Sequence, residues 1–410
     1  MVIITIFAVF PIYWGALWKT PQRSLKGWIV DFDGGPVGQA ITTQMVSASS
    51  QTKLTLAVMP SNNFPGGPNG LARSVVEQHT WVAVTINPGA SERLQASYSS
   101  PNPTYDGSDA ITVYGAEARN ENAYRTLIRP IVNELLQVAQ RSFALQAARQ
   151  LSSSSDLAGL MINSPQTITM PISYKMYNVV PFDQPVASAV TFVGLIYVLI
   201  LSFFVVMITY GAREAAGLNQ NLTLRSLIVI RYVSSFICYF FLSLFYSLVS
   251  LAFHLDFTQK FGHGGFVIFW MLNWVGMLSV GLALEALIPL LTPRFIPFFM
   301  ILWIIVNVAV CIQPIEALPV IYRYGYAIPF YNVSHAVRCI VFATRNRVGQ
   351  NFGILLCWTA ISCCSLLLIQ WYIRRQDIRA YQKEQNHSAN VDMQSSADTD
   401  EKGVNNRCNV

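Results

Sequence analysis

Charged side chains are scarce in this sequence of 410 residues, because Asp, Glu, Lys and Arg together make up only 12% of it. A soluble globular protein carries about 25% charged residues. Since 53% of the residues are hydrophobic, a large part of the chain must face lipid, and we predict a membrane protein. The formal net charge of +6 comes with no nucleic-acid-binding motif. We therefore expect no nucleic acid partner, and the basic excess fits Lys and Arg held on the cytoplasmic side of a bilayer.

Motifs for nucleotide or metal chemistry are also missing. No Gly-Lys dipeptide occurs, which excludes a P-loop and a built-in ATPase. The five histidines are scattered, and no Ser/Lys, His/Asp or metal-binding set stands out. We expect a protein that is not an enzyme and needs no cofactor, so that any uphill transport would draw on a partner or an ion gradient.

A glycine run at residues 33–38, Asp-Gly-Gly-Pro-Val-Gly, follows an expected strand and opens an expected helix. It superficially resembles a dinucleotide-binding turn, but its spacing differs from G-x-G-x-x-G and Pro36 removes a phosphate-binding amide. The pattern favours a tight strand-to-helix turn over a cofactor site.

Cysteine is absent from residues 19–185, since all seven cysteines lie at position 238 or beyond. This segment cannot be held by disulfides and must depend on its own packing. Its composition is that of an ordinary globular domain, with 12 Lys or Arg against 11 Asp or Glu. Short β-branched or aromatic runs alternate with helical ones, which predicts a mixed α/β domain. The expected strands are 28–32, 54–59, 81–86, 111–114 and a return strand before 185, and the expected helices are 37–49, 69–79 and 117–151.

Long apolar stretches are concentrated in the second half of the chain. About 20 mostly apolar residues are needed to cross the hydrocarbon core, and the stretches that meet or approach this length are 186–210, 227–253, 265–291, 295–312 and 352–373. A sixth, 1–18, is short, contains Pro11 and is expected to be a retained signal-anchor helix. The sequence thus predicts an α-helical multi-pass membrane protein with about six transmembrane helices. The α/β domain at 19–185 is inserted between the first two, and a five-helix membrane domain spans 186–373.

Basic residues in the short loops predict the orientation. Arg213 and Arg225 mark the loop after the second helix as cytoplasmic, and a basic cluster at 374–383 does the same for the tail. This places residues 19–185 on the exoplasmic side and a disordered tail, 374–410, in the cytoplasm. This topology would place the arginines between 323 and 347 on the exoplasmic side, against the rule that Lys and Arg stay on the cytoplasmic side. We therefore expect a re-entrant element at 314–350. The expected location is the plasma membrane or another membrane of the secretory pathway.

Three glycosylation sequons accompany this topology, at Asn221, Asn332 and Asn386. Asn221 and Asn386 would be cytoplasmic and unmodified, whereas Asn332 would be exoplasmic but close to the bilayer. Glycosylation of Asn221 would overturn the predicted orientation.

Ionisable and amide side chains inside membrane segments are costly, and they mark positions of functional or structural importance. The residues of this kind that stand out are Glu285, Arg231, Asn273, Asn307 and Arg338. Glu285 can pair with Arg231 or Arg294 to hold helices together, or it can serve transport or ion coupling. Both interpretations stay open at this point.

Several motifs occur in an order that resembles a known family. They are Tyr13-Trp14-Gly15, WIVDFDGGPVG at 28–38, HTWVA at 79–83, VYGAEARN at 113–120 and YAIPFYN at 326–332, which leads to Arg338. Over residues 1–380 the chain resembles the fungal nitrosoguanidine-resistance membrane proteins, and its layout is similar to that of ABC-2-type membrane proteins of the YhgE/Pip branch. The resemblance implies a role in tolerance to toxic compounds, by export or by altering the membrane. It also implies a short helix with a Pro, aromatic and Arg pattern before the last span, but no established active site.

Two functional hypotheses follow. The first is a transporter-like membrane protein without its own ATPase that contributes to resistance to nitrosoguanidine-type mutagens or drugs. The alternative is a scaffold or regulator that transports nothing and controls a separate pump or lipid distribution. The expected partners are the lipid bilayer, a small toxicant or lipid, and a second copy or another membrane protein. A polar cavity among the helices would favour transport, whereas an apolar patch on the outer domain would favour a scaffold.

Overall fold

The structure, a computed structural model, describes the main chain of residues 2–152 and 157–405, and their side chains except at Gln220, Glu384 and 386–405. The last five residues of the predicted tail, with Cys408, lie outside the described residues. The chain divides into two compact units. Unit 1 consists of Met1–Tyr197, Ser243–Gly276 and Leu302–Leu355, and unit 2 consists of Val198–Leu242, Met277–Ile301 and Leu356–Val410.

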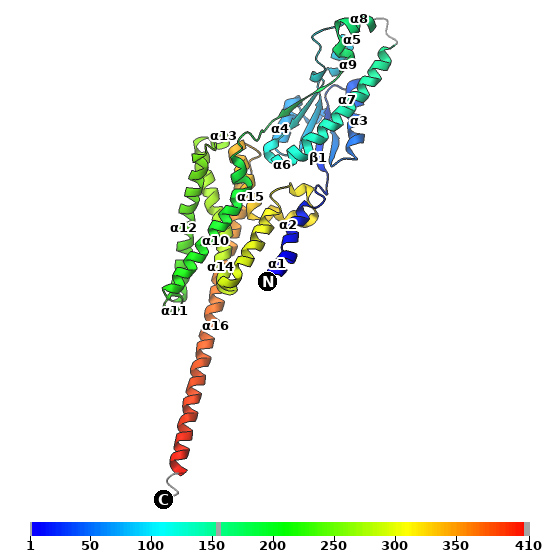
Figure 1. Ribbon diagram of the computed structural model, residues 1–410. Coiled ribbons are helices and arrows are strands. Elements are labelled where there is room, and N and C mark those ends of the chain that lie inside the picture. Colours follow the sequence, from blue (N-terminus) through cyan, green and yellow to red (C-terminus); the bar gives the residue numbers. More distant parts are fainter. Residues whose placement is uncertain (1, 153–156, 406–410) are drawn as a thin grey trace. The chain divides into compact units, whose positions relative to one another are not determined.

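A five-stranded mixed sheet forms the centre of the polar domain in unit 1 (Figure 1). In the order β2-β1-β3-β4-β5 across the sheet, its strands are β2 (Leu54–Met59), β1 (Leu25–Asp31), β3 (Val82–Ile86), β4 (Ile111–Gly115) and β5 (Tyr174–Asn178). β1 runs parallel to β2 and β3, β3 pairs antiparallel with β4, and β4 runs parallel to β5. The central strand β3 is buried along its whole length, as expected of a strand covered on both faces. The predicted strands are confirmed, with ends shifted by a few residues.

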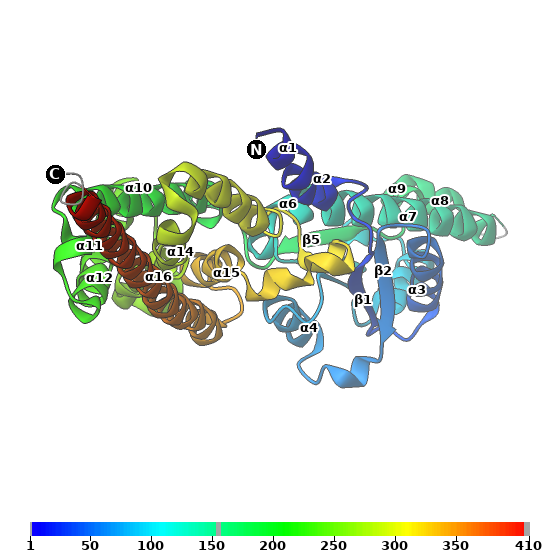
Figure 2. The same cartoon turned by 90° about the horizontal axis from the view of Figure 1, so that it is seen from below.

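Helices cover both faces of this sheet. α3 (Pro36–Ser49), α5 (Ala90–Ser99) and α7 (Arg129–Leu151) form one layer, in which Ile41, Met45 and Leu136 join Ile29 and Val84 in the main hydrophobic core. α4 (Gly67–Val76) packs against β3 and β4 and lies on the opposite side of the sheet from α3 in both views (Figures 1 and 2). The shorter elements are η1 (Ser61–Asn63), η2 (Gly107–Asp109), η3 (Glu117–Arg119), α6 (Glu121–Ala123), the π-helical turn η4 (Tyr124–Ile128), α8 (Leu157–Asn163) and α9 (Pro165–Thr169).

Four helices are long and apolar enough to cross a membrane: Ala189–Ala215, Leu224–Ala252, Thr258–Val308 and Val348–Lys383. The elements within them are η5 (Ala189–Val193), α10 (Gly194–Ala215), α12 (Leu224–Ala252), α13 (Thr258–Phe261), η6 (Gly262–Gly264), α14 (Gly265–Val308) and α16 (Val348–Asn405). A shorter apolar helix, Val2–Leu17, comprises α1 (Val2–Ala8) and α2 (Phe10–Leu17).

The expected count of six spans is met only in part, because the predicted stretches 265–291 and 295–312 belong to one element, α14. Thr292 lies between them with φ 62° and ψ 161°, among Pro289, Pro293 and Pro297. Proline removes main-chain donors, and a positive φ at a β-branched residue marks a turn. α14 therefore changes direction at this point (Figure 1). The first stretch, Val2–Leu17, is shorter than the roughly 20 residues of a full crossing.

Short helices fill the segment between α14 and α16. They are η7 (Ile315–Ala317), η8 (Val320–Ala327) and α15 (Pro329–Phe342). α15 precedes the last long helix, and nearly all of its residues are buried. Its predicted re-entrant position in the membrane stays a prediction.

The helix of the last apolar stretch runs on into the tail, whose predicted disorder stays a prediction. Residues 374–405 continue α16 as a helix to Asn405. The tail contains no proline, and its Gln, Glu, Lys, Arg and Ala residues favour a helix. These helix-favouring residues are concentrated before Asn386, whereas the Asn, Ser, Asp and Gly residues beyond it favour a helix less.

Candidate functional site

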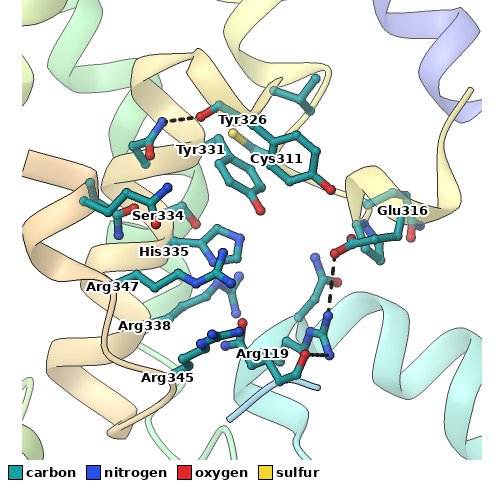
Figure 3. Close-up of a pocket in the computed structure, with 18 of the residues that line it drawn as sticks. Arg119, Cys311, Glu316, Tyr326, Tyr331, Ser334, His335, Arg338, Arg345 and Arg347 are labelled. Atoms are coloured by element: carbon teal, nitrogen blue, oxygen red, sulfur yellow. Dashed lines mark hydrogen bonds and ion pairs between the residues drawn. The ribbon is translucent and has the colours of Figure 1, made fainter. Parts of the chain in front are cut away.

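A cavity of about 370 Å³ lies in unit 1. Its lining comes from the turn before β3, from η3, from the segment after α14, from α15 and from the start of α16. The charged residues of the lining are four arginines and one carboxylate: Arg119, Arg338, Arg345, Arg347 and Glu316. Figure 3 shows the arginine side chains gathered around the cavity, with Tyr331 and His335 beside them. We call this site the arginine pocket.

Arg119 is held by contacts on several sides. Its guanidinium lies over the ring of Trp81, 3.5 Å from the ring centroid, and its Nη1 donates to the carbonyl of Thr80 at 2.9 Å. Its Nη2 lies 3.6 Å from Glu316 Oε1. Burial lowers the pKa of Arg119 to about 10, so the side chain keeps its charge at neutral pH. A guanidinium fixed in this way loses little freedom when it binds a further group.

Arg338 connects α15 to the segment around η3 and α6. Its Nη1 donates to Glu121 Oε2 at 2.5 Å and to the carbonyl of Ala118 at 3.1 Å. Burial opposes ionisation of Glu121, but the charge and hydrogen bond of Arg338 outweigh burial, and the pKa of Glu121 is lowered. Glu121 is therefore ionised at neutral pH and offsets the charge of Arg338.

Arg345 and Arg347 lie in the connection between α15 and α16. Arg345 is half-buried and Arg347 is exposed, and neither forms an ion pair with a residue that the structure describes. Glu316 and Glu121 offset two of the four arginine charges, which leaves the pocket with an excess of positive charge. Such a site attracts anions.

Two amide side chains of the lining have unused polar atoms. Gln313 Oε1 and Asn351 Nδ2 are buried and have no hydrogen-bond partner among the described residues. Both residues line the arginine pocket. Buried polar atoms in folded proteins are nearly always hydrogen-bonded, so these atoms are available to water or to a ligand in the cavity.

Aromatic rings form another part of the lining. The rings of Tyr331 and His335 are tilted by 39° with their centroids 4.2 Å apart, and Tyr326 meets the Tyr331 ring edge to face at 5.5 Å. Burial, reinforced by the neighbouring arginines, lowers the pKa of His335 to about 3. His335 is therefore neutral at physiological pH and contributes a ring face without a charge.

Glu285 and Arg231, both predicted as important, lie together in unit 2. Glu285 is fully buried, and its Oε1 accepts hydrogen bonds from Arg231 Nε and Arg213 Nη2, each at 2.7 Å. The second arginine is thus Arg213 and not Arg294. The sequence places Arg213 in a loop, but α10 continues to Ala215 and carries it into the packed helices.

The two predicted asparagines make separate contacts in unit 1. Asn273 Nδ2 donates to Ser247 Oγ at 2.9 Å. Asn307 Nδ2 donates to the carbonyl of Trp303 at 2.8 Å, and its Oδ1 accepts the main-chain N–H of Phe330 at 3.2 Å, next to the first residue of α15. Neither asparagine lines the arginine pocket. Arg338 is the one predicted residue that does.

Arg119, Arg345 and Arg347 are not among the residues that the sequence singles out. A signal for the last two is present, because arginines in this region contradict the charge count of the predicted topology. Arg119 lies in the VYGAEARN motif, but no local pattern places it beside residues of α15 and α16.

The glycine run at 33–38 forms the tight strand-to-helix turn that the sequence favours. Asp31 Oδ1 accepts the main-chain N–H groups of Asp33 and Gly34 at 2.9 and 3.0 Å, and Ser91 Oγ accepts that of Val37 at 3.0 Å. Gly34 has a φ of +65°, which glycine adopts without strain. The protein's own side chains therefore bind main-chain amides of this turn.

Comparison with known proteins shows the family. A family model described as "Protein of unknown function (DUF3533)" matches residues 1–364. This chain belongs to that family. An uncharacterized endoplasmic reticulum membrane protein of Saccharomyces cerevisiae is 28% identical over 311 residues, which cover 74% of this chain and 61% of the yeast protein. The DUF3533 chain thus spans less than two thirds of that relative's length.

No solved structure matches this DUF3533 chain. The family match, the relative that is a membrane protein and the four long apolar helices together make it a membrane protein of a family of unknown function.

Proposed function

We propose that this DUF3533 protein is a transporter-like membrane protein that recognises a small organic anion in the arginine pocket and contributes to resistance to toxic compounds. The observation behind this proposal is that four arginines surround one cavity, in which Glu316 is the one lining carboxylate among the described residues. The proposal keeps the predicted topology, in which residues 19–185 lie on the exoplasmic side of the membrane.

The chemistry of the pocket narrows the class of ligand. Guanidinium groups pair with carboxylate or phosphate oxygens through two parallel hydrogen bonds. Arg345 and Arg347 have no carboxylate partner among the described residues and can bind such a group, and Asn351 Nδ2 can donate to it. The adjacent rings of Tyr331 and His335 can contact an aromatic part of the ligand. The volume of about 370 Å³ lies within the range of about 300 to 1,000 Å³ that is usual for small-molecule sites.

Tolerance of nitrosoguanidine-type mutagens or drugs is the role that the family resemblance implies. In this proposal the toxic compound, or an acidic derivative of it, carries the anionic group that the arginine pocket binds. The chain has no P-loop, so an ion gradient or a partner membrane protein would supply the energy for transport.

Ligand binding to the purified full-length protein in lipid nanodiscs tests the pocket. The probes are 1-naphthoate and phenyl phosphate, with 1-naphthalenemethanol as the neutral control, and titration calorimetry gives the affinity. The double variant Arg345→Gln/Arg347→Gln removes two guanidinium groups that make no ion pair in the described chain. Losing one charge-assisted hydrogen bond costs about 1.5 to 3 kcal/mol, so the affinity for the anions should fall at least tenfold.

Arg323→Gln is the matched control for this double variant. Arg323 is exposed in η8 and does not line the pocket, so its loss changes the net charge without changing the site. It should bind the anions as the wild type does. Equal affinity in the wild type and the double variant, or equal binding of the neutral alcohol, contradicts the proposal.

Growth in the presence of a nitrosoguanidine mutagen tests the link to resistance. Cells that produce the double variant at wild-type abundance should be more sensitive than cells that produce Arg323→Gln. Identical growth of the two strains would show that the pocket does not serve resistance.

A scaffold or regulator that carries nothing is the second candidate, because apolar side chains are exposed on the polar domain. Leu145 in α7 and Met161 and Ile162 in α8 have exposed fractions of 63%, 62% and 79%. Exposed apolar side chains of this kind suit contact with a partner protein. Reconstituted liposomes separate the candidates, since a transporter moves labelled naphthoate across the bilayer. No flux with or without a gradient, combined with loss of resistance in Ile162→Asp, favours the scaffold.

A further inference from the structure

The buried charge cluster of unit 2 has two guanidinium groups and one carboxylate. Arg231 is fully paired, because its Nε bonds to Glu285 Oε1, its Nη1 to Gln370 Oε1 and its Nη2 to the main-chain carbonyl of Glu285. Arg213 is paired only through Nη2, which also bonds to Glu285 Oε1. Arg213 Nη1 and Glu285 Oε2 are both buried and have no hydrogen-bond partner among the described residues. Two guanidinium groups therefore share a single carboxylate.

Both arginines of the cluster are buried. Arg213 and Arg231 are only 7% and 2% exposed, and both lie in helices that are apolar enough to cross a membrane. An unbalanced charge in such helices is costly, and it is normally balanced by a counter-charge or used for binding. The two guanidinium groups thus carry one positive charge more than their shared carboxylate balances.

A cavity of about 150 Å³ lies beside Arg213. A single water needs about 10 to 15 Å³ by this measure, so the cavity has room for a phosphate group with several waters. Its charged lining residues are three arginines and one exposed carboxylate: Arg213, Arg231, Arg374 and Asp377. Arg374 Nη1 donates to the carbonyl of Asn219 at 2.8 Å, which positions its guanidinium at the cavity.

We propose that this cavity binds the phosphate group of a ligand between Arg213 and Arg374. A phosphate oxygen would accept a hydrogen bond from Arg213 Nη1, and the negative charge of the phosphate would balance the second guanidinium of the cluster. The planar guanidinium forks of two arginines suit the oxygens of one phosphate. This site is independent of the arginine pocket, whose lining residues all belong to unit 1.

The position of the cavity along the helices bears on where the phosphate comes from. Arg213 lies in the last turn of α10, and Asn219 lies in α11 (Leu218–Asn221), which connects α10 to α12. Phospholipid headgroups lie at the ends of membrane-spanning helices, because the apolar spans match the hydrocarbon core. A phospholipid headgroup and a free phosphate ester share the chemistry that this site recognises, and the test distinguishes them.

The test uses the full-length protein with Arg345→Gln and Arg347→Gln, so that the arginine pocket binds anions more weakly. Thermal unfolding in a neutral detergent is followed with glycerol 3-phosphate, with dioctanoyl phosphatidic acid and with dioctanoylglycerol, which has no phosphate. We expect a higher Tm with a phosphate-bearing probe and no change with dioctanoylglycerol. Stabilisation by glycerol 3-phosphate assigns the site to free phosphate esters, and stabilisation by phosphatidic acid alone assigns it to lipid headgroups. No stabilisation by either probe overturns the proposal.

Arg374→Gln and Arg375→Gln are the matched pair for this site. Arg375 is the next residue along α16 and lies 5.2 Å from the centroid of the Trp371 ring, outside the cavity lining. Arg374→Gln should raise the apparent Kd of the phosphate probe at least tenfold, whereas Arg375→Gln should change it less than twofold. Arg374 is the deciding position because Arg213 also holds Glu285, and its variants could fail to fold. Equal Kd values in Arg374→Gln and Arg375→Gln overturn the proposal.

Discussion

Glu285→Gln is the substitution for which we expect the largest loss of stability. Glu285 is fully buried, and its Oε1 accepts hydrogen bonds from Arg213 and Arg231, both at 2.7 Å. Glutamine keeps the shape of the side chain and one acceptor oxygen but removes the negative charge. Removing one partner of a buried ion pair costs about 3 to 5 kcal/mol. Since two arginines lose the same partner here, we expect a loss of about 4 to 5 kcal/mol.

Denaturant unfolding of the full-length protein in a mild detergent, followed by tryptophan fluorescence, measures this loss. Whole domains unfold with about 5 to 15 kcal/mol, so the variant should unfold at a much lower denaturant concentration. Glu134→Gln is the control, because Glu134 lies on the exposed side of α7. Substitutions at exposed positions change the free energy of unfolding by less than about 0.5 kcal/mol.

A second substitution separates charge from shape at this position. In the double variant Glu285→Gln/Arg213→Gln only Arg231 is left as a buried charge, and Gln370 still accepts from it. The double variant should therefore be about 1 to 2 kcal/mol more stable than Glu285→Gln alone. A loss below about 1 kcal/mol in Glu285→Gln, or no gain in the double variant, would refute the reasoning. Normal abundance of Glu285→Gln with lost resistance would instead assign Glu285 to function.

Three further measurements test other parts of the chain. His335 has a pKa of about 3 against an ordinary 6.5, so between about pH 6.5 and 3 the unfolded state binds a proton that the folded state does not, and stability falls as the pH falls. From pH 7 to pH 5 the wild type should lose about 1 to 2 kcal/mol more than His335→Gln in denaturant unfolding, and equal losses would contradict the assigned pKa. Gly281→Ala should destabilise the protein by about 1 to 3 kcal/mol, because its Cβ would lie 2.3 Å from the hydroxyl oxygen of the buried Tyr239. Gly353→Ala meets open space and should leave the Tm nearly unchanged, so similar shifts in both variants would argue against the close packing at Gly281. Asn332 is buried, and its Nδ2 donates to two main-chain carbonyls, so endoglycosidase should not change the gel mobility of the wild type relative to Asn332→Gln.

The sheet and the apolar helices could be predicted from the sequence because both depend on local patterns. Strands β2, β3 and β4 are short runs of β-branched residues between turn residues. Such runs can be recognised in the sequence without knowledge of the fold. The apolar stretches are equally visible. The reversal inside α14 was harder to predict, because Pro289, Pro293 and Pro297 indicate a break without fixing its geometry. The positive φ of Thr292 belongs to the folded structure.

Only some residues of the two charged sites could be predicted from the sequence. Glu285 and Arg231 stand out because ionisable groups are rare in apolar helices. Arg213 does not, because the end of α10 decides whether it lies in a loop or among packed helices, and helix ends are hard to place. Arg119 and Arg338 meet only through tertiary contacts, which no spacing in the sequence records.

The pairing of Glu121 with Arg338 also sets the order in which unit 1 can be completed during synthesis. The two residues are 217 positions apart, and ribosomes add about 5 to 20 residues per second. For about 10 to 40 s the nascent chain therefore carries the Glu121 carboxylate without the arginine that neutralises it. During this interval the part of the arginine pocket that the polar domain contributes is exposed to chaperones. A chain that ends before α15 would keep the strands of the sheet but would expose this unfinished face permanently, which makes it a substrate for quality control.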